Sequence, residues 1–204
     1  MTEFLFNGPK NAGKTVALAH GAGESMDSEF MEFFATGLAE QGLRVARFEF
    51  PYMIKRREDG KRRPPDRAPL LLETYLNIAA ELGPENLIVG GKSMGGRIAS
   101  MIADEAGVAG LVCLGYPFHP PGKPDKLRTE HLAELKTPSL ILQGERDPFG
   151  KRDEVAGYAL SKSIKVGCVP DGDHDLKPRK ASGRTRAENW MDAADRMAVF
   201  ICGL

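Results

Sequence analysis

The 204-residue chain is poor in cysteine and has no long apolar run. Its cysteines are Cys113, Cys168 and Cys202, an odd number without paired spacing, which argues against a disulfide framework and a cysteine-based metal site. We expect them to be buried thiols in a reducing compartment. No stretch approaches the roughly 20 apolar residues of a membrane span, and the first ten residues do not resemble a secretory signal. These absences predict a cytoplasmic protein.

The chain also lacks an excess of either charge. Its 28 basic residues balance 28 acidic ones, so no overall field draws it to nucleic acid or to a membrane, and we expect neither as a partner. Hydrophobic residues make up 42% and charged residues 27% of the chain, as in ordinary soluble domains. There is no internal repeat and no low-complexity tract. The length predicts a single domain over residues 1–204.

Short apolar runs rich in Val, Ile and Leu alternate with longer segments of helical period. Strands are expected at residues 15–21, 43–50, 86–93, 109–117, 139–145 and 163–169, with a seventh candidate at 3–7. Helices are expected at residues 27–41, 68–82, 94–106, 151–161 and 188–201. This alternation predicts an α/β fold, with a mostly parallel sheet of six to seven strands and helices on both faces.

The segment 51–67, PYMIKRREDGKRRPPDR, is the least regular part of the chain. It holds seven Lys or Arg residues and three prolines, a composition that predicts a loop rather than a helix or strand. One interpretation is a hydrated, mobile connection, because charge runs usually serve no further purpose. The other is a cationic rim that attracts acidic substrates or a partner.

Residues 8–15, GPKNAGKT, match the phosphate-binding pattern G-x-x-x-x-G-K-[ST]. Such a loop joins a strand to a helix, whose N-terminal amides face the phosphates. Here the apolar run VALAHGAG follows Thr15 and predicts a strand instead. The context therefore favours a turn between two strands over a nucleotide-binding site.

The segment 89–96, VGGKSMGG, contains the pattern G-x-S-x-G between an apolar strand and a helical segment. This is the context of a nucleophile elbow, in which a sharp strand-to-helix turn presents a serine above the sheet. Flanking glycines are needed there because side chains would collide with neighbouring segments. The pattern predicts Ser93 as a nucleophile, and the alternative is a turn whose glycines serve packing alone.

A serine nucleophile requires a base and a group that orients this base. Among the four histidines, His174 is the one in a polar turn just after the last expected strand, and Asp147 follows the preceding strand. The order Ser93, Asp147, His174 is the nucleophile, acid, base order of α/β-hydrolases. All three would lie at the carboxyl ends of strands, where open α/β sheets place their sites.

Acyl transfer also needs hydrogen-bond donors for the oxyanion of its tetrahedral intermediate. The backbone N–H of Met94, the residue after the nucleophile, is the first expected donor. The second should come from the loop after the strand at 15–21, where Ala22 is the first choice and Gly21 the next.

Four motifs together resemble the α/β-hydrolase superfamily, and within it the small dienelactone-hydrolase-related group: AHGAG, GGKSMGGR, LGYPFHPPGKPD and LILQGERDPFG. They are similar to a branch of compact predicted hydrolases that includes bacterial proteins and the hydrolase-like domains of testis-expressed protein 30 and of subunit 3 of the NSL histone-acetyltransferase complex. The resemblance covers nearly the whole chain. It implies the fold, hydrolase chemistry and the roles of Ser93, Asp147 and His174, but no particular substrate.

Larger members of the superfamily carry a cap, whereas residues 116–128 here form only a proline-rich connection. We therefore expect an open site that suits small or extended acyl substrates. The segment 51–67, with Tyr52, and the segment 117–124, with His119 and Lys123, are the expected walls and substrate contacts. A stiff surface loop explains the prolines equally well.

These features predict a serine hydrolase that cleaves an ester or thioester of a small-molecule acyl substrate, as a monomer or homodimer and without a metal or organic cofactor. The alternative is a non-catalytic α/β-hydrolase-like module that binds a protein partner through residues 51–67. An intact Ser-His-Asp arrangement beside an open cleft would favour the enzyme. A cleft filled by Tyr52 or Phe149 would favour the binding module.

Overall fold

The computed structural model describes residues 2–204 and contains one seven-stranded sheet. Its strands are β1 (Leu5–Asn7), β2 (Thr15–Ala19), β3 (Arg44–Phe48), β4 (Leu87–Lys92), β5 (Gly110–Leu114), β6 (Ser139–Gly144) and β7 (Ile164–Val169). They lie in the order β1-β3-β2-β4-β5-β6-β7. All six expected strands are present, and the seventh candidate forms the edge strand β1.

The sheet is parallel except at one edge, where β1 runs antiparallel to β3. Every residue of β4, β5 and β6 is buried, as expected for strands that are covered on both faces. Because parallel strands end at the same edge, the loops that follow β2, β4, β6 and β7 meet there. This edge carries the site described below.

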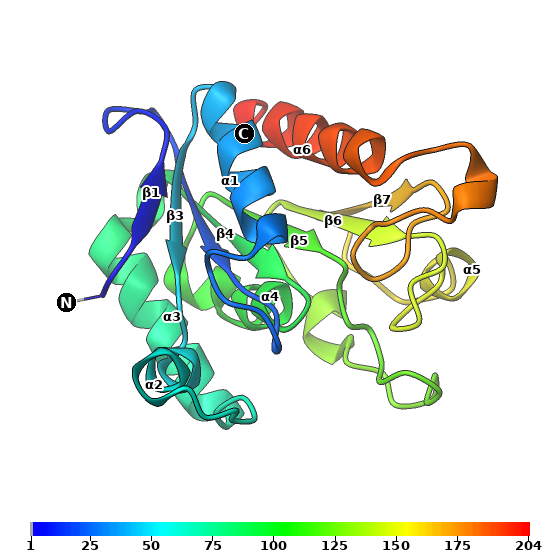
Figure 1. Cartoon of the computed structure of the whole chain (residues 1–204), viewed down its shortest axis with the longest axis horizontal. Coiled ribbons are helices and arrows are strands. Elements are labelled where there is room, and N and C mark those ends of the chain that lie inside the picture. Colours follow the sequence, from blue (N-terminus) through cyan, green and yellow to red (C-terminus); the bar gives the residue numbers. More distant parts are fainter. Residues whose placement is uncertain (1) are drawn as a thin grey trace.

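Helices cover both faces of the sheet, which confirms the predicted fold class (Figure 1). Within the described residues they are α1 (Glu29–Glu40), α2 (Pro51–Asp59), α3 (Ala68–Leu82), α4 (Met94–Ala106), α5 (Arg152–Val155) and α6 (Arg186–Cys202). Helices α1 and α6 pack on one face, and the other four contribute to the core on the opposite face.

An aromatic cluster joins α1 to α6. The Trp190 ring lies 5.1 Å from the rings of Phe30 and Phe33 and 6.1 Å from that of Phe34, measured between centroids. The three phenylalanines share one face of α1 because they are three and four residues apart. Burying each aromatic ring contributes about 2 kcal/mol. This cluster fixes α6, which follows the His174 loop in the chain.

Segment 51–67 is not entirely the loop that its composition predicts, since residues 51–59 form α2. Pro51 occupies the first turn, where its missing N–H costs no hydrogen bond. The N–H of Tyr52 donates to a carboxylate oxygen of Asp66 at 2.8 Å, and Gly60 ends the helix in a left-handed conformation. The Tyr52 side chain is buried, so the run of charges forms the outer face of an amphipathic helix.

The helix expected at residues 151–161 is much shorter in the structure. Helix α5 ends at Val155, and Gly157, a weak helix former, follows two residues later. Beyond it the chain turns, and the N–H of Ser161 donates to the carbonyl of Leu132 at 2.9 Å. This contact ties the chain beyond the helix to the β5–β6 connection.

The sequence predicts three buried cysteines, but the three thiols differ in their exposure. Each is a free thiol, but Cys113 alone is fully buried, Cys168 is partly exposed and Cys202 is exposed. Cys202 lies in the last turn of α6, where the preceding residue, Ile201, faces the core and Cys202 points to solvent.

The segment that matches the phosphate-binding pattern forms a turn between β1 and β2, as its context predicts. The N–H of Ala12 donates to the carbonyl of Pro9 at 3.2 Å within this turn. The Lys14 ammonium donates to the carbonyl of Ile201 at 2.7 Å. Lys14 thus binds the C-terminal end of α6, where carbonyls lack helical partners and favour a cation.

The connection between β5 and β6 carries no cap domain, as expected. Within the described chain its only regular element is a short 3-10 turn, Glu130–Ala133. No helix found in residues 2–204 combines the length and the apolar character needed to cross a membrane.

Candidate active site

Ser93 lies at the sharp turn from β4 into α4, with a φ of 51° and a ψ of −115°. This is a strained conformation for a residue with a side chain. A Cβ atom at Gly91 or Gly95 would collide with the carbonyl of Ala19 on the neighbouring strand. The N–H of Ser93 donates to the carbonyl of Leu114 at 2.9 Å, which ties the turn to β5. Gly91 and Gly95 are therefore required because no side chain fits at either position.

The His174 ring joins Ser93 to Asp147. Its Nε2 lies 2.9 Å from the hydroxyl oxygen of Ser93, and its Nδ1 lies 2.8 Å from a carboxylate oxygen of Asp147. The Phe149 ring also packs against the His174 imidazole, with their centroids 4.2 Å apart. The structure thus brings together the three residues that the sequence selects from separate strand ends.

The Asp147 carboxylate is fully buried, and the loop around it is arranged to accept its charge. One oxygen accepts a hydrogen bond from the N–H of Phe149 at 2.9 Å. The other accepts from the Gln143 amide at 3.0 Å, in addition to the contact with His174. A buried charge is stable only with such hydrogen-bond partners. These hydrogen bonds stabilise the negative charge of Asp147 and fix the position of its carboxylate.

Two backbone amides beside Ser93 are free to bind an oxyanion. Ala22 and Met94 both line the cleft at Ser93, and neither N–H donates a hydrogen bond anywhere in residues 2–204. Met94 is also the first residue of α4, where the helix dipole favours negative charge. Gly21 is placed differently, because it does not line the cleft.

His20 holds the loop that carries Ala22. Its Nε2 accepts a hydrogen bond from the N–H of Phe50 at 3.2 Å, and its Nδ1 lies 2.8 Å from the carbonyl of Gly21. Since the Phe50 N–H can only donate, Nδ1 carries the ring proton and donates to the carbonyl. Burial lowers the pKa of His20 below its usual value, which keeps this ring neutral. His20 is thus a structural anchor of the loop.

The cleft in front of Ser93 has a volume of about 490 Å³ and is open to solvent. Its lining residues come from the loops at the carboxyl ends of the strands and from the first turns of α3 and α4. They are Ala22, Pro65, Asp66, Ala68, Leu71, Ser93, Met94, Arg97, Ile98, Pro117, Arg128 and Phe149. Both expected walls contribute, through Pro65 and Asp66 on one side and Pro117 on the other.

The expected substrate contacts lie elsewhere. Tyr52 is buried, and its hydroxyl donates to the carbonyl of Ala22 at 3.1 Å, so it supports the loop from behind. His119 is also buried, with Nδ1 2.9 Å from the carbonyl of Pro120. Lys123 lies exposed on a turn of the β5–β6 connection. None of the three lines the cleft.

Two arginines line the cleft although the sequence interpretation did not select them. Arg97 follows Ser93 by four residues, which places it one helical turn further along the same side of α4. This four-residue spacing from Ser93 is a sequence signal that could have identified Arg97 as a cleft residue. Arg128 comes from the β5–β6 connection, and no local pattern marks it.

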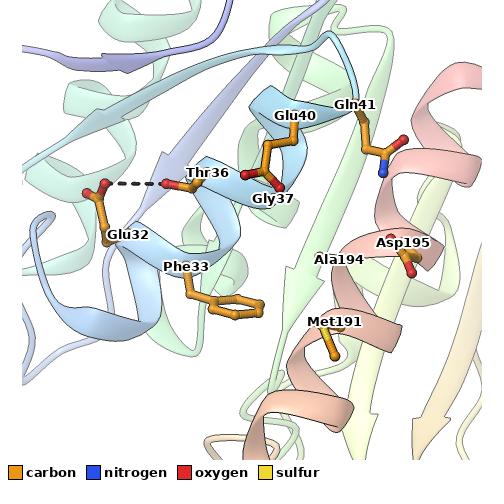
Figure 2. A pocket seen from close by; sticks show the side chains of 9 residues that line it. All are labelled: Glu32, Phe33, Thr36, Gly37, Glu40, Gln41, Met191, Ala194 and Asp195. Atoms are coloured by element: carbon orange, nitrogen blue, oxygen red, sulfur yellow. Dashed lines mark hydrogen bonds between the residues drawn. The ribbon is translucent and has the colours of Figure 1, made fainter.

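A second depression, of about 430 Å³, lies between α1 and α6 on one face of the sheet (Figure 2). Phe33 and Met191 project between the two helices, and the Thr36 hydroxyl donates to Glu32 at 3.4 Å. The nine described residues that line it include no serine, cysteine or histidine. In residues 2–204 no group of three or more His, Cys, Asp or Glu side chains is placed to hold a metal. This depression therefore offers no candidate nucleophile of the Ser93 kind.

Comparison with known proteins agrees with this architecture. An alpha-beta serine hydrolase homologue from Coxiella burnetii is 18% identical, with a TM-score of 0.69 over 96% of this chain and 89% of that chain. A serine hydrolase without lid from Xanthomonas campestris is 17% identical, with a TM-score of 0.67 over 94% and 87% of the two chains. A dienelactone hydrolase from Anabaena variabilis is 23% identical, with a TM-score of 0.67 over 92% and 87%. At such identities the likeness establishes the fold.

Residues 12–202 match the family model described as an alpha/beta hydrolase domain. This span includes every strand except β1 and every residue of the candidate site. The chain therefore belongs to the alpha/beta hydrolase domain family.

Proposed function

We propose that the protein is a serine hydrolase that cleaves an ester or thioester through an acyl-enzyme. The observation that carries this proposal is the position of the His174 ring, which contacts both the Ser93 hydroxyl and the buried Asp147 carboxylate. A hydroxyl is a weak nucleophile at neutral pH and needs such a base. The open cleft in front of Ser93 gives a substrate carbonyl access to it.

In the proposed reaction, the Ser93 oxygen attacks the substrate carbonyl while Nε2 of His174 takes the hydroxyl proton. His174 then gives this proton to the leaving alcohol or thiol, and the acyl group remains on Ser93. A water molecule, deprotonated by the same ring, releases the acid. Asp147 keeps the ring proton on Nδ1 and stabilises the charged imidazolium.

The oxyanion that forms at each step would be bound by the N–H groups of Met94 and Ala22. Both amides line the cleft and are unpaired in the described structure. Preorganised donors of this kind contribute on the order of a hundredfold or more to the rate each. We propose Met94 and Ala22 as the oxyanion hole, because Gly21 lies outside the cleft.

The four sequence motifs also support a proposed place in the small dienelactone-hydrolase-related branch, beside the hydrolase-like domains of testis-expressed protein 30 and NSL-complex subunit 3. The free thiols agree with a proposed cytoplasmic location. The binding-module alternative is not favoured, because Tyr52 lies outside the cleft and Phe149 packs on His174 without filling it.

Labelling with a fluorophosphonate probe, followed by intact-mass measurement, tests the proposal. We expect stoichiometric labelling of the wild type and none of Ser93→Ala. The same two proteins are then assayed with 4-nitrophenyl esters of short and long acids and with acyl thioesters. Hydrolysis by the wild type alone would identify the acyl class.

Ser100→Ala is the matched control. Ser100 also contacts a histidine, with its hydroxyl oxygen 2.9 Å from Nε2 of His131, but it is buried behind the cleft. We expect Ser100→Ala to be labelled like the wild type. Undiminished labelling of Ser93→Ala would refute the proposed nucleophile.

A further inference from the structure

Arg97 extends from the first turn of α4 into the wall of the Ser93 cleft. Its Nε is shielded from solvent and has no hydrogen-bond partner in the described structure. The Arg97 carbonyl accepts from the Ser100 hydroxyl at 2.7 Å, which holds this turn of the helix in place. A guanidinium has five donors and no way to lose its charge, so leaving a shielded donor such as this Nε unpaired is costly.

Arg128 supplies a second guanidinium to the same cleft. Its backbone is fixed, since its N–H donates to the carbonyl of Phe118 at 2.7 Å. Burial and then the charge of Arg97 lower the pKa of Arg128, so the two cations lie near enough to repel each other. No ion pair within residues 2–204 involves either arginine. Two like charges are therefore kept together without an internal partner.

The groups behind the arginines are neutral. His131 and Tyr116 lie within a hydrogen-bonded cluster with Ser100, at 2.9 Å and 3.2 Å from its hydroxyl oxygen. Burial and the nearby Arg97 lower the pKa of His131, and burial raises that of Tyr116, so neither carries charge at neutral pH. This cluster cannot neutralise the guanidinium groups.

One carboxylate, Asp66, also lines the cleft. Its Oδ2 accepts from the N–H of Tyr52 at 2.8 Å, at the positive N-terminal end of α2. Asp66 is therefore occupied by a helix N-terminus and forms no ion pair with Arg97 or Arg128. The charged residues of the cleft wall thus leave a net positive charge beside Ser93.

From this arrangement we propose that the cleft binds substrates bearing an anionic oxygen group, a carboxylate or a phosphate, which Arg97 and Arg128 hold while Ser93 attacks the ester carbonyl. Arginine suits this task because its planar fork matches the geometry of both anions. The proposal rests on the proposed hydrolase function and specifies its substrate class.

Two 4-nitrophenyl esters test the preference at constant ionic strength: the glutarate hemiester, which carries a carboxylate, and its methyl ester, which is neutral. Rates are corrected for uncatalysed hydrolysis. We expect the wild type to show a ratio of kcat/KM, anionic over neutral, on the order of ten or more, as charge-assisted hydrogen bonds imply. Arg97→Gln and Arg128→Gln should each reduce this ratio by about tenfold.

Arg62→Gln is the control for general electrostatics, since it removes one exposed positive charge from the neighbouring segment without touching the cleft wall. We expect it to keep the wild-type ratio. Inhibition of neutral-ester hydrolysis by glutarate and by inorganic phosphate, measured on the wild type, needs no folded variant and shows which anion is preferred. A ratio near one in the wild type, together with no inhibition by either anion, would overturn the proposal.

A failure of the hydrolase function would be distinguishable. If the wild type cleaves neither ester and takes no fluorophosphonate label, calorimetric titration with glutarate and phosphate still tests the anion site. Binding that Arg97→Gln weakens about tenfold would support the site without the chemistry. Cleavage of both esters at equal rates, with no anion binding, would instead retain the hydrolase and reject the anion site.

Discussion

Lys92 and Asp175 form an ion pair that joins the residue before Ser93 to the residue after His174. The same ammonium donates to Glu24 at 2.8 Å, on the loop that carries Ala22. The Lys92 side chain is only 4% exposed and lies over the Phe30 ring, with its nitrogen 4.6 Å from the centroid. One buried cation thus connects the three loops that supply the nucleophile, the base and the proposed oxyanion donor.

We predict that Lys92→Met reduces kcat far more than it changes stability. The two carboxylates that lose their partner are partly exposed and regain water, so the free energy of unfolding should fall by only about 1 kcal/mol. The substitution removes the ion pairs that connect the loops. Small misplacements of the reacting groups then cost up to about 100-fold in rate. Steady-state kinetics on a neutral ester and urea unfolding measure the two effects.

Lys162→Met, on an exposed lysine, is the control for loss of one positive charge. We expect it to match the wild type in both measurements. Lys92 acts as a positioning residue, so its substitution should affect kcat with little effect on KM. A Lys92→Met protein with normal kcat would show that the ion pairs of Lys92 have no role in catalysis.

We predict that Asp27 stabilises the fold in a pH-dependent way. Its hydrogen bond with Arg57, and then that with Ser25, lower the pKa of the Asp27 carboxyl to about 2 from an ordinary value of 3.8. Because the folded pKa is the lower one, the stabilisation is present above pH 4 and is lost as the pH falls towards 2. Asp27 is about half exposed, so the effect should stay below about 1 kcal/mol.

Urea unfolding of Asp27→Asn and of the wild type between pH 6 and pH 3 measures this contribution. The difference in unfolding free energy should stay constant from pH 6 to about pH 4 and shrink as the pH falls further to 3. Asp125→Asn, at an exposed carboxyl of the β5–β6 connection, serves as the control. A difference for Asp27→Asn that stays constant across this range would contradict the assignment.

The strands and the Ser93, Asp147, His174 arrangement were predictable because each leaves a local mark. A buried parallel strand is an apolar run, the elbow requires glycines at fixed spacing, and the site residues follow strand ends in a fixed order. The fold then brings these ends to one edge of the sheet. For this part of the molecule, the arrangement in space follows from the order in the chain.

Helix α2 and the cleft wall could not be predicted in this way, because their partners are distant in sequence. The N-terminus of α2 is stabilised by Asp66, 14 residues beyond Tyr52. Most residues of this helix are charged or exposed, so its short buried face gives no clear apolar period in the sequence. The sequence places Tyr52 and His119 in segments that flank the cleft, yet packing turns both side chains inward. Arg128 reaches the cleft from a loop that has no periodicity at all.

We predict that Gln143→Leu destabilises the protein by about 3 kcal/mol. The Gln143 amide oxygen accepts from the N–H of Tyr116 at 2.7 Å, and its nitrogen donates to Asp147 and to the carbonyl of Gly150. Leucine would leave the buried Tyr116 N–H and Gly150 carbonyl unpaired, at a cost of about 1–3 kcal/mol each, and would remove one of the hydrogen bonds to Asp147. Urea unfolding measures the loss. Gln41→Leu, at an exposed glutamine, is the control and should change the free energy of unfolding by less than about 0.5 kcal/mol. Equal losses of unfolding free energy in the two variants would refute the role of Gln143.

Lys14 is the lysine of the segment that matches the phosphate-binding pattern. Its ammonium donates to the Ile201 carbonyl at the end of α6. Lys14→Met removes this hydrogen bond and a favourable interaction with the helix dipole. We therefore expect the free energy of unfolding to fall by about 1 kcal/mol. Neither the wild type nor the variant should gain thermal stability from ATP and Mg²⁺, because β2, and not a helix, follows the turn. Lys10→Met, on the same turn and exposed, is the matched control. A rise in Tm with ATP that Lys14→Met abolishes would restore the nucleotide-binding interpretation.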